Sequence, residues 1–311
     1  MKSRTIILGT ITAMLISCSA ALAGQIQTTV SIAPVKYFVE RIGGENVKAN
    51  IMVKAGSSPA TYEPQPKQMA ELSKSEIYFA IGVPFEKAWL PRFKSANKNL
   101  EIISLGQEVV HRSMKAHVHK HEGHEHKHEH HTENGHHKDH DHDALHNEPH
   151  IKDPHVWLSP SLVRIMSQKI RDTLIEHDPA NTDTYIRNYL NFASEINSVD
   201  ADLLKIFTHK GQEFSFMVYH PSWGYFADTY GLTQIPIELE GKDPSPKELA
   251  QLIEFAKDNS VKAIFVQPQF SQKSAQTIAK AIGAQVLVAN PLAEDWPGNL
   301  RRTAKAFAKQ N

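Results

Sequence analysis

Apolar and polar residues follow two repeating patterns along the chain from residue 25 onward. Short runs rich in β-branched residues alternate with stretches whose apolar positions recur every three or four residues, which are typical of buried strands and amphipathic helices. Strands are predicted over 26–31, 47–53, 77–81, 100–104, 214–219, 234–239, 262–267 and 285–289, and helices over 35–42, 246–258 and 272–282. This alternation predicts two similar α/β lobes.

A long helix is predicted between the two lobes, over residues 179–208. No glycine or proline follows Pro179 in this stretch. Its apolar side chains recur at steps of three and four; they are Tyr185, Tyr189, Phe192, Ile196, Val199, Leu203 and Ile206. At 1.5 Å per residue, a helix of roughly 28 residues spans about 40 Å and can join both lobes as a stiff connector. A pair of shorter helices is the alternative.

Residues 112–152 interrupt the pattern at the end of the first lobe. This segment has few apolar side chains and contains 14 histidines interleaved with Glu and Asp. Too little apolar surface is available to offset the entropy lost on ordering, so we expect a long mobile loop. The histidines are His117, His119, His121, His124, His126, His128, His130, His131, His136, His137, His140, His142, His146 and His150.

The histidine-rich loop is expected to bind several metal ions weakly. Imidazoles and carboxylates without fixed geometry gather borderline metals such as zinc, copper or nickel. Because neutral imidazole is the ligand form and its unperturbed pKa is about 6.5, the loop would release metal on acidification. A solvated spacer is the alternative. The H-E-x-x-H pattern at 124–128 is expected by chance in such a tract and lacks the buried helix that zinc hydrolases require.

The beginning of the chain has the features of a signal peptide. Lys2 and Arg4 precede an apolar run over 6–16, and Ala-Leu-Ala at 21–23 offers a cleavage site. The run is about half of the ~20 residues that span a bilayer, so we expect a soluble mature protein in the periplasm. Cys18, the only cysteine, also fits a lipoprotein site loosely, which leaves a lipid anchor as the alternative. Cleavage after residue 23 leaves only nitrogen and oxygen ligands for a metal.

Composition and charge narrow the function classes and the domain organisation. Lys and Arg together number 34, as do Asp and Glu, and no basic cluster follows a helix face, so no nucleic acid is indicated as a partner. A chain of 311 residues suits two compact lobes, and we expect a monomer. The predicted parts are a signal peptide (1–23), an N-terminal lobe (24–111 and 153–178), the inserted loop (112–152), a linking helix (179–208) and a C-terminal lobe (209–311).

Two histidines outside the loop lie at the ends of predicted elements. His155 is in the Asp-Pro-His-Val-Trp segment at 153–157, directly before a helix, and His220 follows the strand over 214–219. The carboxyl ends of strands in open α/β sheets are where ligands bind. The two histidines are therefore candidate metal ligands that face one another, with an ordinary structural role as the alternative.

Several sequence motifs are distinctive enough to suggest a family. They are Asp-Pro-His-Val-Trp-Leu-Ser-Pro at 153–160, Tyr-His-Pro-Ser-Trp-Gly-Tyr-Phe at 219–226, Gln-Pro-Gln-Phe-Ser at 267–271, Ala-Gly-Ser-Ser-Pro at 55–59, Tyr-Glu-Pro at 62–64 and Asn-Pro-Leu at 290–292. With the acidic, histidine-rich tract, they resemble the ZnuA-like family, the zinc-binding proteins of zinc-uptake ABC importers, over nearly all of the mature chain. The resemblance implies a rigid helix between two α/β lobes, with Zn2+ or a related divalent metal held in the cleft and delivered to a membrane permease.

The resemblance makes His155 and His220 two of the family's metal ligands, but other positions depart from its pattern. Ala60 stands where the family has a histidine, Asn290 where it has an aspartate, and Gln267 where relatives often have a glutamate. Alanine has no donor atom, and a neutral amide carbonyl offsets the charge of a metal less than a carboxylate does. Asn290 and Gln267 are therefore weaker ligand candidates.

Two imidazoles alone make a weak zinc site, so its completion is left open. A loop histidine, Glu63, or water with a second ligand could supply the missing donors, and loss of high-affinity zinc binding is a further possibility. The leading interpretation is a solute-binding protein that is not an enzyme. A periplasmic metal buffer that binds through the loop and a surface adhesin of the same fold are the alternatives. No G-x-S-x-G elbow, phosphate-binding glycine loop or dinucleotide fingerprint supports an enzyme.

Overall fold

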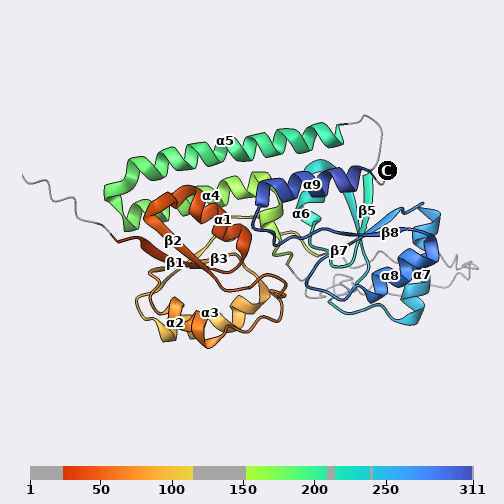
Figure 1. The fold of residues 1–311 in the computed structure, drawn as a ribbon, viewed down its shortest axis with the longest axis horizontal. Helices are drawn as coiled ribbons and strands as arrows, with labels where there is room; N and C mark the ends of the chain where they lie inside the picture. Colours follow the sequence, from red (N-terminus) through yellow and green to blue (C-terminus); the bar gives the residue numbers. More distant parts are fainter. Residues whose placement is uncertain (1–23, 115–151, 209–213, 239–240, 310–311) are drawn as a thin grey trace, which may run out of the picture.

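Two four-stranded parallel β-sheets form the centres of two lobes (Figure 1). The computed structural model describes residues 24–114, 152–208, 214–238 and 241–309. The sheet orders are β2-β1-β3-β4 and β6-β5-β7-β8, with every neighbouring pair parallel. The strands are β1 (Ile26–Val30), β2 (Val47–Ile51), β3 (Ile77–Ala80), β4 (Glu101–Ser104), β5 (Phe214–Val218), β6 (Leu232–Pro236), β7 (Ala263–Val266) and β8 (Gln285–Val288). The predicted fold class, two α/β lobes, is confirmed.

Strand β6 differs most from its predicted range of 234–239. It begins two residues earlier, because Leu232 already pairs with Phe214 at the first step of the ladder. Beyond its last residue, the backbone N–H of Glu238 donates to the carbonyl of Tyr219 at 3.0 Å. The end of β6 is thereby held beside the end of β5, although the predicted last residue, Leu239, lies outside the described residues.

Helices cover both sheets, and prolines mark where several of them begin. They are α1 (Ala33–Gly43), α2 (Pro66–Leu72), α3 (Pro84–Ala96), α4 (Pro160–His177), α5 (Thr182–Phe207), α6 (Gly224–Tyr230), α7 (Pro246–Asp258), α8 (Lys273–Ile282) and α9 (Trp296–Ala308). A proline suits the first turn because the N–H that it lacks would have no partner within the helix there. Helices α2, α3 and α9 are additions to the elements that the sequence pattern predicts.

The long helix α5 runs along both lobes without a break (Figure 1). It begins at Thr182, after a short 3-10 turn at Pro179–Asn181, and ends at Phe207. Its buried side chains are Tyr185, Phe192, Ile196, Val199 and Leu203, all from the stripe that the sequence predicts. This face packs against α4, α1 and α9. The alternative of two shorter helices is therefore wrong.

One hydrophobic core continues from the N-terminal lobe into the C-terminal lobe beneath α5. The ring of Trp296, at the start of α9, contacts Phe38 of α1 edge to face, with 5.4 Å between the ring centroids. The indole N–H of Trp296 donates to the carbonyl of Trp157 at 2.7 Å, and the indole N–H of Trp157 donates to the carbonyl of Pro291 at 2.7 Å. These contacts fasten the two lobes to each other behind the cleft.

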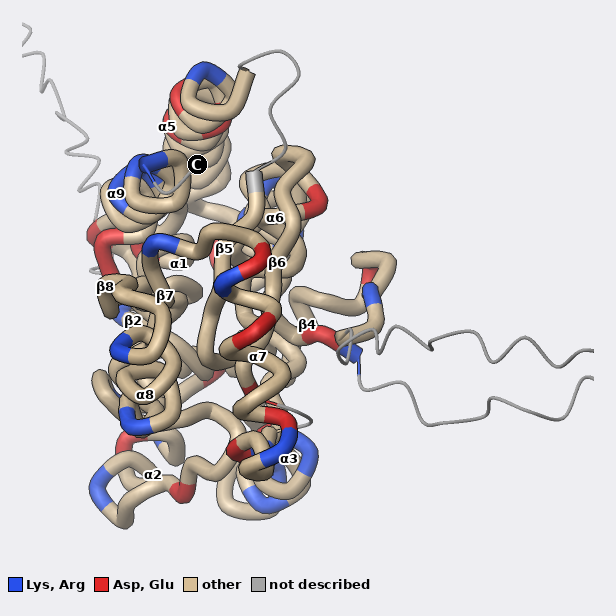
Figure 2. The backbone as a smooth tube through the Cα atoms, turned by 90° about the vertical axis from the view of Figure 1, so that its right-hand side faces the viewer, with Lys and Arg blue, Asp and Glu red and all other residues tan. Residues whose placement is uncertain are grey.

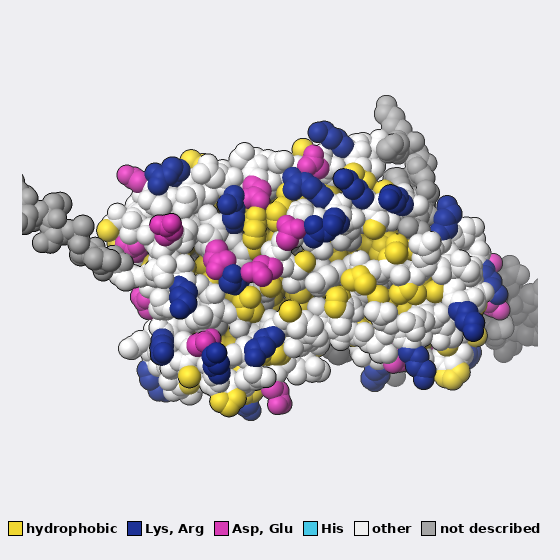
Figure 3. Space-filling view, in the orientation of Figure 1, with side chains coloured by type: hydrophobic (Ala, Val, Ile, Leu, Met, Phe, Trp, Pro, Cys, Tyr) yellow, Lys and Arg dark blue, Asp and Glu magenta, His cyan; other side chains and the backbone are white. Residues whose placement is uncertain are grey.

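Charged side chains of both signs are interspersed along the chain and on the face viewed in Figure 3 (Figures 2 and 3). Some of them form ion pairs that join the helices: Arg41 of α1 lies 2.7 Å from Glu195 of α5, and Arg301 of α9 lies 2.8 Å from Asp202 of α5. These pairs support the packing of α1 and α9 on α5. Within the described part of the chain, none of the helices is both long enough and apolar enough to cross a bilayer.

Candidate metal site

A cavity of about 120 Å³ lies between the lobes at the ends of the strands. The N-terminal lobe contributes Pro59 and Ala60, and the C-terminal lobe contributes Phe270 and Leu292. Most of its lining is apolar, but the imidazoles of His155 and His220 also line it. A small, mostly apolar cavity with a few convergent polar groups is typical of a ligand site.

His155 is held in place by a buried carboxylate two residues before it. Asp153 Oδ1 accepts a hydrogen bond from the backbone N–H of His155 at 3.0 Å and lies 2.7 Å from the ring Nδ1. Both residues are buried, and a short 3-10 turn at Val156–Leu158 follows before α4 begins. The side chain of Asp153 therefore fixes both the backbone and the ring of His155.

His220 is held in the same way by a carboxylate from the neighbouring strand. It follows β5, and its Nδ1 lies 2.6 Å from Oε1 of Glu238, a buried residue that follows β6. Gln267, at the end of β7, accepts from the backbone N–H of His220 at 3.2 Å and donates to its carbonyl at 2.7 Å. The ring of Phe270 stacks on the imidazole with 4.7 Å between centroids. Three adjacent strand ends thus position this side chain.

The two imidazoles face each other with their ring centroids 5.2 Å apart. Each Nδ1 is directed at a carboxylate, and among the described residues no hydrogen bond is made to either Nε2. A carboxylate bonded to Nδ1 keeps the proton there and leaves the Nε2 lone pair free for a metal. Burial lowers the pKa of His155, although Asp153 acts in the opposite direction. The lowered pKa favours the neutral form of the ring, which is the form that binds metals.

Comparison with known proteins identifies the family of this chain. Residues 29–310 match the family described as "ZnuA: Zinc-uptake complex component A periplasmic". The chain belongs to the ZnuA family. The resemblance drawn from its sequence motifs is thereby confirmed.

Individual members of the ZnuA family are similar to this chain over most of its length. The high-affinity zinc uptake system protein ZnuA of Bacillus subtilis (strain 168) is 29% identical over 281 residues, a match that covers 86% of this chain and 79% of that protein. The zinc-binding lipoprotein AdcA of Streptococcus pneumoniae (strain ATCC BAA-255 / R6) is 27% identical over 297 residues, which cover 94% of this chain and 56% of AdcA. The chain therefore spans about half the length of the AdcA relatives.

Solved structures of ZnuA proteins have the same fold. A crystal structure of ZnuA is 39% identical, with a TM-score of 0.79 over 92% of this chain and 99% of that one. A ZnuA deletion mutant with zinc bound is 38% identical, with a TM-score of 0.78 over 92% of this chain and 98% of that one. A laminin-binding protein of Streptococcus agalactiae, described as having adhesin and metal-transporting activity, is 20% identical with a TM-score of 0.73, which shows the fold alone.

The ZnuA-like chain brings some of its predicted site residues together and leaves others apart. Ala60 lines the cavity but has no donor atom. The side-chain amide of Gln267 forms hydrogen bonds with the backbone of His220. Asn290 Oδ1 accepts a hydrogen bond from the backbone N–H of Leu292 at 3.0 Å. Neither amide lines the cavity, and Glu63 is exposed outside it. Among the described members of the predicted set, only His155 and His220 both line the cavity and carry a donor atom.

The 14 predicted loop histidines lie outside the described residues. The described residues that flank this segment, Met114 and Lys152, both line the cavity. Within the described part of the chain, no group of three or more His, Cys, Asp or Glu side chains is arranged to hold a metal. The described site therefore consists of two imidazoles and the carboxylates behind them.

Asp153 and Glu238 are functional candidates that the sequence patterns did not single out. The sequence could have revealed Asp153, because it lies in the same motif as His155 and only two residues before it. Glu238 is separated from His220 by 18 positions, and no spacing rule links them. Only the parallel pairing of β5 with β6 brings the two together, at a shared edge of the sheet.

Proposed function

We propose that this chain is an extracytoplasmic solute-binding protein that captures Zn2+ between His155 and His220 and delivers it to the permease of an ABC importer. The observation that carries the proposal is the pair of imidazoles that line the cavity with their centroids 5.2 Å apart, each with Nδ1 directed at a buried carboxylate. Such carboxylate–histidine pairs orient the ring and raise the basicity of a metal ligand. Zinc is the cargo in this proposal, and the chain has no catalytic role.

The spacing of the rings supports a shared metal ion. Zinc–nitrogen bonds of about 2.0–2.1 Å, added to a ring radius of roughly 1.1 Å, put each centroid about 3.2 Å from the ion. At a tetrahedral angle, the two centroids would then be about 5 Å apart, close to the 5.2 Å separation of His155 and His220. The two remaining positions around zinc would be filled by water, by a loop histidine or by Glu63.

The remaining parts of the chain fit the same proposal. Residues 1–23 would act as a signal peptide, and the mature chain would work in the periplasm with the histidine-rich loop as a set of weaker metal ligands. The N-terminal lobe (24–111 and 153–178) and the C-terminal lobe (209–311), joined by the helix within 179–208, would both contact the permease. The names of the ZnuA and AdcA relatives, which describe zinc uptake and zinc binding, support zinc as the cargo.

Zinc titration by calorimetry tests the proposal on mature protein lacking residues 117–150. We expect one tight site, and we expect it to disappear when His155→Ala and His220→Ala are combined. The matched control is His177→Ala, because His177 pairs with Glu101 at the end of α4, away from the cavity, and its loss should leave the tight site intact. A tight site that survives the double substitution would contradict the proposed ligands.

A metal buffer that binds through the loop is the second candidate function. The observation that favours it is Ala60, which lines the cavity where a third donor would be needed. In that case the protein lacking 117–150 would bind no zinc tightly, whereas the full chain would bind several ions weakly. The same titration therefore separates the two candidates.

A further inference from the structure

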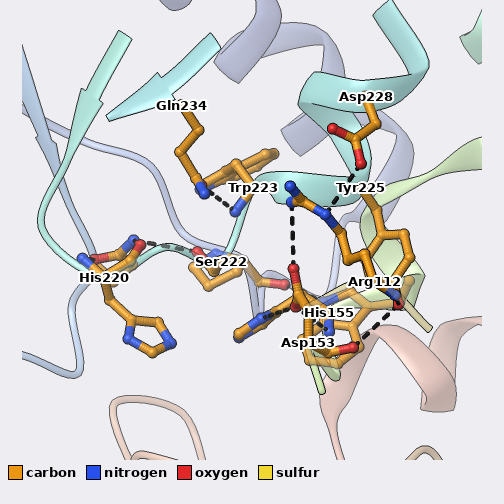
Figure 4. Close-up of polar contacts among 12 residues, drawn as sticks. Arg112, Asp153, His155, His220, Ser222, Trp223, Tyr225, Asp228 and Gln234 are labelled. Atoms are coloured by element: carbon orange, nitrogen blue, oxygen red, sulfur yellow. Dashed lines mark hydrogen bonds and ion pairs between the residues drawn. The ribbon is translucent and has the colours of Figure 1, made fainter. Parts of the chain in front are cut away.

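Arg112 lies behind the proposed metal site, between two carboxylates (Figure 4). Its Nη1 is 3.4 Å from Asp153 Oδ2, and its Nε is 3.0 Å from Asp228 Oδ2. The side chain of Asp153 is 1% exposed, whereas that of Asp228 is 59% exposed. We infer that Arg112 is a positioning residue for His155: it holds the Asp153 carboxylate in the orientation that fixes the imidazole. This inference rests on the proposed zinc site.

The two oxygens of Asp153 have separate partners. Oδ1 accepts from the backbone N–H of His155 and lies against its Nδ1, while Oδ2 faces Arg112. A buried carboxylate that loses its cation is left with an uncompensated charge, which is strongly unfavourable. Without Arg112, none of the described residues would hold Oδ2, and the Asp153 carboxylate could rotate away from His155. Such a rotation weakens the acceptor that keeps the ring proton of His155 on Nδ1 and its Nε2 free for zinc.

The C-terminal lobe fixes Arg112 in turn, through helix α6. The backbone N–H of Arg112 donates to Oη of Tyr225 at 3.0 Å, and this hydroxyl donates to the carbonyl of Asp153 at 3.2 Å. The backbone N–H of Asp153 donates to the carbonyl of Arg112 at 2.9 Å. The guanidinium carbon also lies 5.8 Å from the centre of the Tyr225 ring. Residues 112 and 153 are thus fastened to each other and to α6.

Gly224 supplies the space that the guanidinium occupies. A Cβ atom built at this first residue of α6 would lie 1.2 Å from Arg112 Nη1 and 2.8 Å from Asp153 Oδ2. No side chain larger than hydrogen fits there unless the Arg112–Asp153 pair moves. The position of this ion pair therefore depends on glycine at residue 224.

This arrangement links the orientation of His155 to the opposite lobe. The other pair, His220 and Glu238, comes entirely from the C-terminal lobe, and within the described part of the chain Glu238 has His220 as its only ion-pair partner. Asp153 instead pairs with a cation that also contacts Asp228 and Tyr225 of α6. A shift of α6 relative to the N-terminal lobe would therefore move the support of one zinc ligand.

The test is the zinc affinity of the full mature chain. It is measured against a chelator that keeps free zinc low enough for weaker histidine sites to stay empty. Arg112→Gln should weaken the tight site about tenfold, the lower end of the range for outer partners of metal-bound histidines. The matched control is Asp228→Asn, which removes the exposed partner of the same guanidinium. It should change the affinity less than about threefold, because exposed ion pairs contribute little.

A double-substitution cycle distinguishes positioning from a general structural effect. If Arg112 acts through Asp153, adding Arg112→Gln to Asp153→Asn lowers the affinity no further than Asp153→Asn alone. Losses that add up in the double variant overturn the inference, as does an unchanged affinity in Arg112→Gln.

A second route keeps the test decisive if Arg112→Gln fails to fold. Gly224→Ala displaces the guanidinium without removing its charge, so it should also weaken zinc binding about tenfold. Arg112→Lys should retain part of the zinc affinity because a cation still faces Asp153. Wild-type affinity in Gly224→Ala overturns the inference. Two other results would contradict the proposed function, and this inference with it. One is that the wild-type chain has no tight zinc site, and the other is that the tight site survives when His155→Ala and His220→Ala are combined.

Discussion

Two buried carboxylates determine how the imidazoles are presented, and Glu238 is the one that acts on His220. Its side chain is 2% exposed, and its Oε1 lies 2.6 Å from Nδ1 of His220. Glu238→Gln replaces a charged acceptor with a neutral amide, so we expect the zinc affinity to fall about 10- to 100-fold if His220 is a zinc ligand, as for outer partners of metal-bound histidines. Chelator competition on the full chain measures the change.

Glu254→Gln is the matched control for this prediction. Glu254 of α7 is exposed and does not line the cavity, so the same chemical change there should leave the affinity unaltered. The separate variant Glu63→Gln tests one of the alternatives that the sequence leaves open, because a loss as large as that at Glu238 would show that Glu63 completes the metal shell. Equal affinity of Glu238→Gln and the wild type would argue against a role for the buried carboxylate.

Among individual residues, the sequence predicts the candidate metal ligands better than the residues that hold those ligands in place. His155 and His220 stand out because each lies at the end of an element, within a distinctive motif. Glu238 and Arg112 do not, since their contacts join positions 18 and 41 residues apart. Such pairs depend on how β5, β6 and α6 pack, which local patterns do not specify.

At the scale of elements, the loop between β3 and α3 depends on one buried carboxylate. Glu86, in the first turn of α3, accepts hydrogen bonds from the backbone N–H groups of Ile81 and Gly82, both at 2.9 Å. Residues 82–84 line the cavity. Glu86→Gln turns one acceptor oxygen into a donor, so we expect the free energy of unfolding to fall by about 1–3 kcal/mol. Urea denaturation of the metal-free protein measures it.

The exposed Glu108 provides the control for Glu86. Glu108→Gln should leave the urea midpoint unchanged, because no buried donor loses its acceptor there. If both variants were as stable as the wild type, the Glu86 carboxylate would not hold the loop.

Sequence periodicity predicts the strands and α5 more completely than the shorter helices. Strands β3 and β7, for example, are continuous apolar runs, and α5 has a long uninterrupted stripe. Helix α3, in contrast, contains Pro91 in its interior, a residue that normally ends a helical pattern. In α9, the buried stripe includes Thr303 and Ala304 between Leu300 and Phe307, so its apolar signal is weak. These helices form because the lobes offer surfaces on which they pack.

At the scale of the whole molecule, the lobes are fastened together behind the cavity. The fully buried Trp296 contacts Phe38 of the N-terminal lobe and donates to the carbonyl of Trp157. Helix α5 packs on α4 and α9, so it covers elements of both lobes. Because interiors of this kind are close-packed, large opening motions would break many contacts at once. In the proposed function, zinc capture should therefore involve small shifts near the cavity rather than wide closure of the lobes.

The shared core also predicts that the two lobes unfold together. For metal-free protein, we expect a single calorimetric transition whose calorimetric and van't Hoff enthalpies agree. Trp296→Ala removes the interlobe ring and hydrogen bond, so it should lower the free energy of unfolding by about 3–5 kcal/mol and broaden or split the transition. Trp89→Ala, within the N-terminal lobe on α3, should cost less and leave one transition, because Trp89 is only partly buried. Two separate transitions in the wild type would mean that each lobe is stable alone, and that the contacts of Trp296 do not couple them.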